Sequence, residues 1–233
     1  MIRRLAERLV LVDLLPQAAD LLQHQVDSRL QGAARAQVAS RLAAIYLMDH
    51  KPEDALRNIR ATRQAQLPDW LDAERRLLEG RALMELKQYD FALEVLLNDT
   101  SAEAERVRAD IYWGAGNWGP AAEHIEQVLT DRWRDPAPLQ PDERLNIMRG
   151  AICYLFNKDA FGLSSLRERY GPIMKGSPDE AAFDLVTAKP DVSSADVGEV
   201  AKRIAAADTL DAFMKAFKAR YAAQEANAAA KTN

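Results

Sequence analysis

The sequence predicts an all-α protein, an α-solenoid of antiparallel helix pairs that ends in C-terminal capping helices. Two observations predict this fold class. Ala and Leu dominate the 233 residues, whereas Thr, Ile, Gly and Pro are scarce, which is a composition typical of helices. In addition, one pattern of small and large apolar residues returns several times along the chain, as it does in proteins built from stacked helical repeats.

The pattern is clearest over residues 43–56, 80–93 and 109–121. In each copy a small residue is followed three positions later by a large one, then by a polar turn, and then by an alanine. Such small residues are expected where two helix backbones approach closely, so each copy predicts two antiparallel helices joined by a tight turn. The small residues are Ala43 and Ala55, Gly80 and Ala92, and Ala109 and Ala121.

Two further copies extend the pattern on both sides. The copy before it runs through Ala6, Leu9, Ala18 and Leu22. The more divergent copy after it is predicted at Gly150, Cys153, Gly162 and Leu166. Proline stands near the predicted start of three second helices, where its missing N–H costs nothing. These prolines are Pro16, Pro52 and Pro120.

The C-terminal third departs from the repeat. Ser177 to Glu180 form a capping box with proline at the first helical position, which predicts a helix from Pro178 to Thr187. Beyond Lys189-Pro190, apolar residues recur at three- and four-residue steps over Val197–Tyr221, which predicts an amphipathic helix. This helix is expected to cap the last repeat, and the alternative is a partner helix that mediates self-association.

The copies resemble the tetratricopeptide repeat (TPR) family over roughly residues 2–170, through Leu42, Ala43, Tyr46 and Ala55 and their counterparts in the next two copies. The family's proline is only approximated by Pro68 and Pro136, so a Sel1-like or HAT-like array stays open. The predicted organisation is a repeat array over 1–170, a helical cap over 171–224 and a frayed tail over 225–233. Because the first copy has no polar cap, we expect the chain to be the C-terminal segment of a longer bacterial repeat protein.

Composition and charge exclude several classes of protein. The net charge of −4 argues against a dedicated nucleic-acid binder, and the single cysteine excludes an intrachain disulfide framework. No apolar run is long enough to span a bilayer, so no membrane insertion is expected. The charged N-terminus does not resemble a signal peptide. The location stays open between bacterial cytoplasm and periplasm.

No motif in the sequence predicts catalysis, a cofactor or a metal. Gly114–Gly119 match the G-x-G-x-x-G pattern, but a helix is predicted before them in place of the strand that a dinucleotide site needs, so they indicate a turn. His24, His50 and His124 fall in different copies, which argues against a metal site. Cys153 stands among apolar residues and is expected to be a buried thiol.

The resemblance implies a groove, lined by the first helix of each pair, that binds a protein or peptide partner of unknown identity. The family's clamp for C-terminal carboxylates is disfavoured, because Ser40 and Ala44 stand where it needs Lys and Asn. The groove positions carried over to this chain are Met48, Leu77, Arg81, Met84, Arg106, Asp110, Trp113 and Tyr154. The predicted function is a non-catalytic scaffold or adaptor, and the alternative is a structural or self-association segment of a longer protein.

Overall fold

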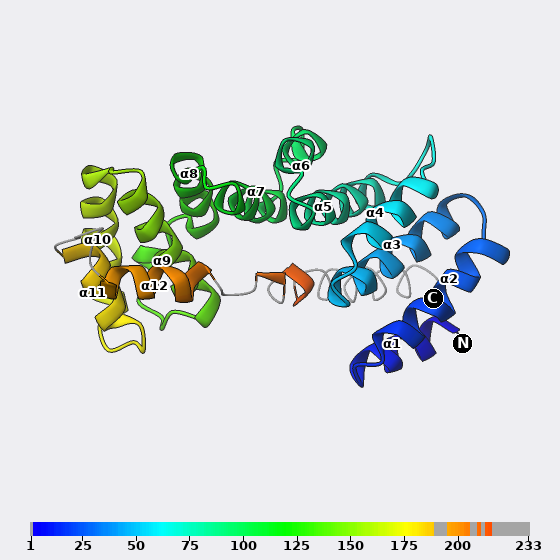
Figure 1. The fold of residues 1–233 in the computed structure, drawn as a ribbon, viewed down its shortest axis with the longest axis horizontal. Coiled ribbons are helices and arrows are strands. Elements are labelled where there is room, and N and C mark those ends of the chain that lie inside the picture. Colours follow the sequence, from blue (N-terminus) through cyan, green and yellow to red (C-terminus); the bar gives the residue numbers. More distant parts are fainter. Residues whose placement is uncertain (1, 189–194, 206–208, 211–212, 216–233) are drawn as a thin grey trace. The chain divides into compact units, whose positions relative to one another are not determined.

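The computed structural model describes residues 2–188, 195–205, 209–210 and 213–215 (Figure 1). These residues form helices and contain no strand, which confirms the all-α prediction. The described residues fall into two compact units, one over 2–100 with 214–215 and the other over the described part of 101–213. The predicted tail at 225–233 lies outside the described residues, and so does the end of the predicted stripe over Val197–Tyr221, with Phe217 and Tyr221.

The first unit contains three helix pairs, and each of its helices packs against the next one along the chain. The small residues predicted at the helix crossings of this unit are all buried. They are Ala6, Ala18, Ala43, Ala55, Gly80 and Ala92. Gly80 lies so close to the second helix of its pair that an added Cβ would stand 3.1 Å from a methyl carbon of Leu96. The helices are α1 (Ile2–Leu11), α2 (Leu15–Ser28), α3 (Gly32–Met48), α4 (Pro52–Ala61), α5 (Asp69–Glu85) and α6 (Tyr89–Leu96).

The second unit contains two helix pairs and two further helices, which pack on one continuous core. Helix α11 contacts α9 and α10, and it buries Phe183 and Val186. The elements are α7 (Ala102–Gly114), α8 (Trp118–Leu129), the 3-10 turn η1 (Arg132–Arg134), α9 (Pro141–Phe156), α10 (Ala160–Met174), α11 (Glu180–Ala188) and α12 (Ala195–Ala205).

The helix expected from Pro178 begins two residues later, at Glu180. The Ser177 hydroxyl accepts a hydrogen bond from the Asp179 N–H at 3.3 Å, and the Glu180 carboxylate accepts one from the Gly176 N–H at 2.7 Å. A turn over 177–179 thus replaces the first helical turn, since the Ser177 side chain competes with the helix for a backbone donor.

The same type of turn joins the two helices in each of the five helix pairs of the described residues. The N–H after the turn residue bonds to the carbonyl five positions earlier, as in Lys51 to Tyr46 at 2.8 Å and Asn117 to Tyr112 at 2.9 Å, which satisfies the last carbonyls of the first helix. The turn residue has a left-handed conformation in every pair. These residues are Asp13, His50, Lys87, Gly116 and Lys158. Gly116 belongs to the glycine-rich motif, whose interpretation as a turn is therefore confirmed.

The shared turn corrects the alignment of the fifth pair by one residue. In the turn of this pair, the Asp159 N–H donates to the carbonyl of Tyr154, so Tyr154 is the equivalent of Tyr46, Leu83 and Tyr112. The sequence alignment predicts Cys153 at that position. The prediction went wrong because Gly150 and Gly162 look like the small pair of the other copies. Gly162 is small for a different reason, since a Cβ there would stand 2.4 Å from the Tyr154 ring.

Candidate functional site

Helix pairs within each unit are joined by equivalent side-chain contacts. The Tyr46 hydroxyl on α3 donates to Gln23 Oε1 on α2 at 3.2 Å, and the Tyr154 hydroxyl on α9 donates to Glu126 Oε1 on α8 at 2.7 Å. Gln23 and Glu126 each follow the buried alanine of their own helix by five positions. The first and second units therefore use one scheme to connect a helix pair to the pair before it.

A second set of equivalent contacts joins the first helices of neighbouring pairs. Arg41 on α3 lies 3.7 Å from Glu7 on α1, and Arg149 on α9 lies 2.8 Å from Asp110 on α7. Both arginines are buried. A buried guanidinium needs such a partner, because leaving it uncompensated costs several kcal/mol.

Three predicted groove residues, Arg106, Asp110 and Trp113, share one face of α7 at i, i+4 and i+7. Arg106 is exposed, and the other two are half-buried. Arg149 joins this face from α9, since it pairs with Asp110 and its guanidinium carbon lies 4.9 Å from the Trp113 ring centre. Trp113 also meets Trp118 edge-on, with ring centres 5.4 Å apart. We call Arg106, Asp110, Trp113 and Arg149 the α7 face.

Sequence reasoning missed Arg149 on this face. The signal was present, because Arg41 and Arg149 each stand two positions before a buried alanine, Ala43 and Ala151. The alignment of the fifth copy on Gly150 concealed that equivalence.

The structure places the fourth predicted residue of the second unit, Tyr154, against α8. Its hydroxyl bonds to Glu126, which also accepts from Arg169 at 2.5 Å. Burial and the hydrogen bond to Glu126 raise the pKa of Tyr154 well above its usual range, so the phenol is protonated at physiological pH.

The other predicted groove residues belong to the first unit. Leu77 and Arg81 on α5 are buried, and Arg81 Nε donates to Glu85 Oε1 at 3.1 Å within the same helix. Met48 on α3 is half-buried against the core of α1 and α2, and Met84 is half-buried on α5. Their role in binding a partner stays a prediction.

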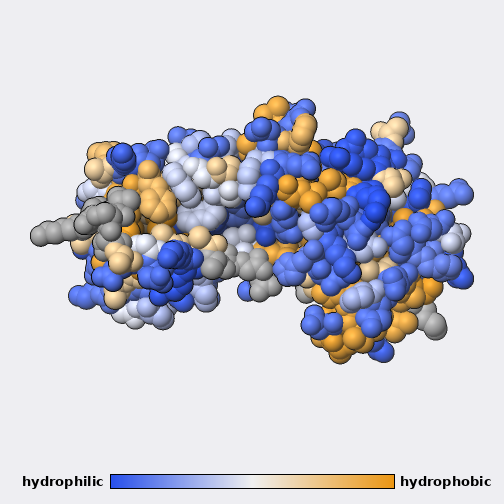
Figure 2. Space-filling model, in the orientation of Figure 1, coloured by the Kyte–Doolittle hydropathy of each residue, from blue (hydrophilic) through white to orange (hydrophobic). Residues whose placement is uncertain are grey.

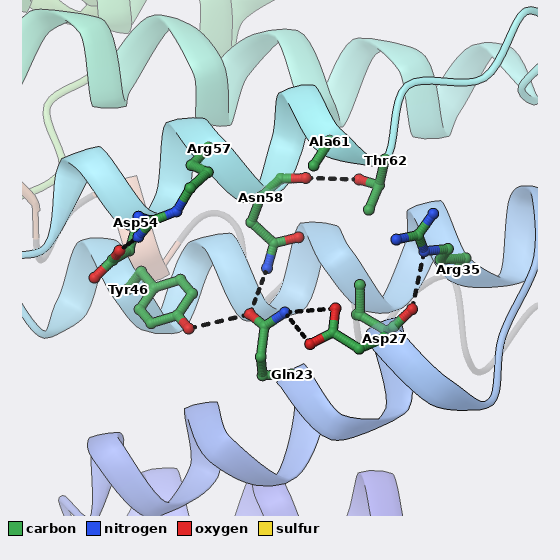
Figure 3. A pocket seen from close by; sticks show the side chains of 10 residues that line it. Gln23, Asp27, Arg35, Tyr46, Asp54, Arg57, Asn58, Ala61 and Thr62 are labelled. Carbon is green, nitrogen blue, oxygen red and sulfur yellow. Dashed lines mark hydrogen bonds and ion pairs between the residues drawn. The ribbon is translucent and has the colours of Figure 1, made fainter.

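A hollow of about 170 Å³ opens between α2, α3 and α4 (Figure 3). The sequence analysis did not identify it, because its residues come from three helices and form no motif. Most of the residues that line the hollow have polar side chains, and Val26 of α2 and Ala61 of α4 are the apolar residues of the lining. The polar lining residues are Gln23, Asp27, Arg35, Tyr46, Asp54, Arg57, Asn58 and Thr62.

Gln23 organises the polar side chains of the hollow. Its Nε2 donates to both Asp27 oxygens at 2.9 and 3.0 Å, and its Oε1 accepts from Tyr46 and from Asn58 Nδ2, the latter at 3.4 Å (Figure 3). Burial and the nearby Asp20 raise the pKa of Tyr46, which keeps its hydroxyl protonated as a donor. Asp54 and Arg57 form an ion pair at the rim.

The titratable groups with candidate chemistry have local structural roles. His124 Nδ1 lies 2.6 Å from Glu105 Oε2, and its ring stacks on Tyr112 with ring centres 5.2 Å apart. Within the described part of the chain, no three His, Cys, Asp or Glu side chains gather as they would around a metal ion. Cys153 is buried, and its burial raises the pKa of the thiol to about 12 although Arg149 opposes the shift.

Cys153 is therefore expected to resist alkylation in the native protein. Because the thiolate is the reactive species and burial raises the thiol pKa, iodoacetamide at pH 8 should label the native thiol on the order of a hundredfold more slowly than the thiol of the protein in guanidinium chloride. Intact-mass spectrometry of timed samples measures both rates. Equal rates would show that the thiol is accessible.

Exposed apolar side chains gather on α1 and on the turn between α1 and α2 (Figure 2). Leu11 is 80% exposed and Val12 is 65% exposed, and Leu5 and Leu14 are exposed as well. Among the helices of the described residues, none is long and apolar enough to cross a membrane.

Comparison with known proteins identifies no relative of this chain. No protein-family model matches it, and neither the curated proteins nor the solved structures contain a significant match.

Proposed function

We propose that this chain is a non-catalytic interaction module, a TPR-like array of helix pairs that binds a protein or peptide partner. The α7 face carries the proposal. Helix α7 packs into the second unit through Ala104, Val107, Ala109 and Ile111. Arg106 is exposed, whereas Asp110 and Trp113 are half-buried at the edge of that core. Tryptophan and arginine are the residue types that contribute most to protein interfaces.

The α7 face is also held in place before any partner arrives. Trp113 is fixed by the Arg149 guanidinium and by the Trp118 ring, so binding to it immobilises little. The charge of Arg149 is compensated by Asp110, whereas Arg106 presents its cation at the surface one turn before Asp110. This arrangement suits a partner segment that places an apolar side chain beside a carboxylate.

The proposal predicts that changing Arg106 and Trp113 abolishes partner capture without unfolding the protein. We expect Arg106→Glu combined with Trp113→Ala to lower the recovery of specific partners from a host extract by at least about tenfold, which corresponds to 1.4 kcal/mol. Quantitative mass spectrometry of affinity-purified samples measures the recovery, and circular dichroism checks the fold. Glu123→Lys on the exposed side of α8 is the matched control. Equal recovery by all three proteins would contradict the proposal.

Self-association is the second candidate function, and the exposed apolar side chains of α1 favour it. It predicts a concentration-dependent mass in sedimentation equilibrium, which Leu11→Ser with Val12→Ser would abolish. Under the interaction-module proposal these two substitutions leave partner capture unchanged.

A further inference from the structure

The hydrogen bonds around Gln23 determine how the Asn58 amide is oriented. Asp27 carries a carboxylate that can only accept, so the Gln23 group facing it is the NH₂ group and the Gln23 carbonyl points the other way. That carbonyl accepts from Tyr46 and must receive a donor from Asn58. Asn58 therefore presents Nδ2 to Gln23 and turns Oδ1 away from it, as Figure 3 shows.

The side-chain carbonyl oxygen of Asn58, Oδ1, is buried and has no hydrogen-bond partner among the described residues. Asn58 is only 6% exposed, and its side chain lines the hollow between α2, α3 and α4. An acceptor left in this state is unfavourable, so a guest that donates a hydrogen bond to it would recover free energy.

Arg35 lines the same hollow with hydrogen-bond donors. Its Nε donates to the Val26 carbonyl at 2.9 Å, which fixes the guanidinium plane. The terminal nitrogens are left to line the hollow (Figure 3). The hollow thus offers one fixed acceptor, Asn58 Oδ1, and one fixed group of donors, Arg35. A guest that matches both must carry a donor and an acceptor.

The charges around the hollow favour a neutral guest. The lining contains two carboxylates, Asp27 and Asp54, and two guanidiniums, Arg35 and Arg57. A cation or an anion would meet two attractive and two repulsive charges in this balanced setting. A primary carboxamide is neutral, and it carries an NH₂ donor and a carbonyl acceptor on one carbon.

We propose that this hollow binds the side-chain carboxamide of a glutamine or asparagine in the partner polypeptide. The amide NH₂ donates to Asn58 Oδ1, and the amide carbonyl accepts from Arg35. A volume of about 170 Å³ holds such a side chain. This inference rests on the proposed function, because it names one residue type of the partner.

The test uses the full chain and two small probes in ¹⁵N-detected NMR titrations. N-acetyl-glutamine methylamide is expected to bind with a Kd on the order of 1–10 mM and to shift the Asn58 side-chain NH₂ and the Arg35 Nε–H signals. N-acetyl-glutamate methylamide, which has the same shape with a carboxylate, should bind at least about tenfold more weakly. Equal binding of the two probes, or no saturable shift at Asn58, overturns the assignment and leaves water as the guest.

Three variants connect the binding to the two contacts. Asn58→Leu removes the acceptor and Arg35→Met removes the donors, and each should abolish the shifts caused by the glutamine probe. Arg29→Met, at an exposed arginine that follows α2, is the matched control and should bind like the unaltered protein. Tyr46 and Gln23 stay unchanged in all three, and circular dichroism confirms that each variant is folded.

Free L-glutamine separates a polypeptide guest from a free amino acid. If free glutamine binds at least about tenfold more tightly than the blocked probe, the site is built for the amino acid and the polypeptide assignment is overturned. The α7 variants do not touch this hollow. Loss of partner capture by those variants together with absent amide binding would therefore overturn the carboxamide assignment and leave the proposed function standing.

Discussion

Replacing Arg75 with methionine is expected to destabilise the first unit by about 3 kcal/mol. Arg75 is buried on α5, and its guanidinium donates to the carbonyls of Ala36 and Ile59 at 2.9 and 2.5 Å and to the Thr62 hydroxyl at 3.0 Å. These bonds connect α5 to α3 and to the C-terminal end of α4. Methionine keeps the apolar stem but leaves the three acceptors without this donor.

Urea unfolding followed by circular dichroism measures the loss. Burial lowers the pKa of Arg75, yet an arginine remains charged at neutral pH, so its hydrogen bonds are the strong, charge-assisted kind. Arg76→Met is the matched control, because Arg76 is partly exposed and pairs with Asp72 one turn earlier in the same helix. It should change the free energy of unfolding by no more than about 0.5 kcal/mol. Equal losses in the two variants would refute the role assigned to Arg75.

Gly162→Ala is expected to destabilise the second unit by about 2 kcal/mol, although alanine is normally the better helix former. An alanine Cβ would stand 2.4 Å from the Tyr154 ring, which cannot move aside freely because its hydroxyl is bound to Glu126. Gly171→Ala lies in the same helix, α10, with nothing within 4 Å of the added carbon. That control should be neutral or stabilising by up to about 1 kcal/mol.

A double-mutant cycle isolates the clash at Gly162. Combining Gly162→Ala with Tyr154→Leu should recover part of the loss caused by the alanine, since leucine lacks the ring that the Cβ meets, whereas Asp159 Oδ2 still stands 2.8 Å from the added carbon. Thermal and urea unfolding of the four proteins measure the coupling. Additive effects would show that Gly162 is small for some other reason.

The fold was predictable to the extent that small residues mark helix crossings. Ala43, Ala55 and Ala109 are buried where the repeat places them, because close backbone approach tolerates only a small side chain. The fifth pair was misaligned by one residue because Gly150 and Gly162 imitate that pattern. The carbonyl that accepts across its turn belongs to Tyr154, and sequence spacing alone does not reveal which carbonyl accepts.

The candidate site was predictable only in part, because its important polar residues are buried by tertiary contacts. Arg149 and Asn58 have side chains typical of the surface, yet each occupies the interior of a helix crossing. What holds them there is a partner from another helix, such as Asp110 for Arg149 and Gln23 for Asn58. Such pairing joins residues that are more than 30 positions apart in the sequence, so it leaves no local pattern there.

Site-specific photo-crosslinking tests the central claim most directly. A photoreactive amino acid replaces Arg106 on the α7 face in one protein and Glu123 on α8 in the other, and both proteins are irradiated in an extract of the source organism. The account predicts that position 106 crosslinks to a discrete partner protein and that position 123 does not. Crosslinks of equal yield from both positions, or none from position 106, would contradict it.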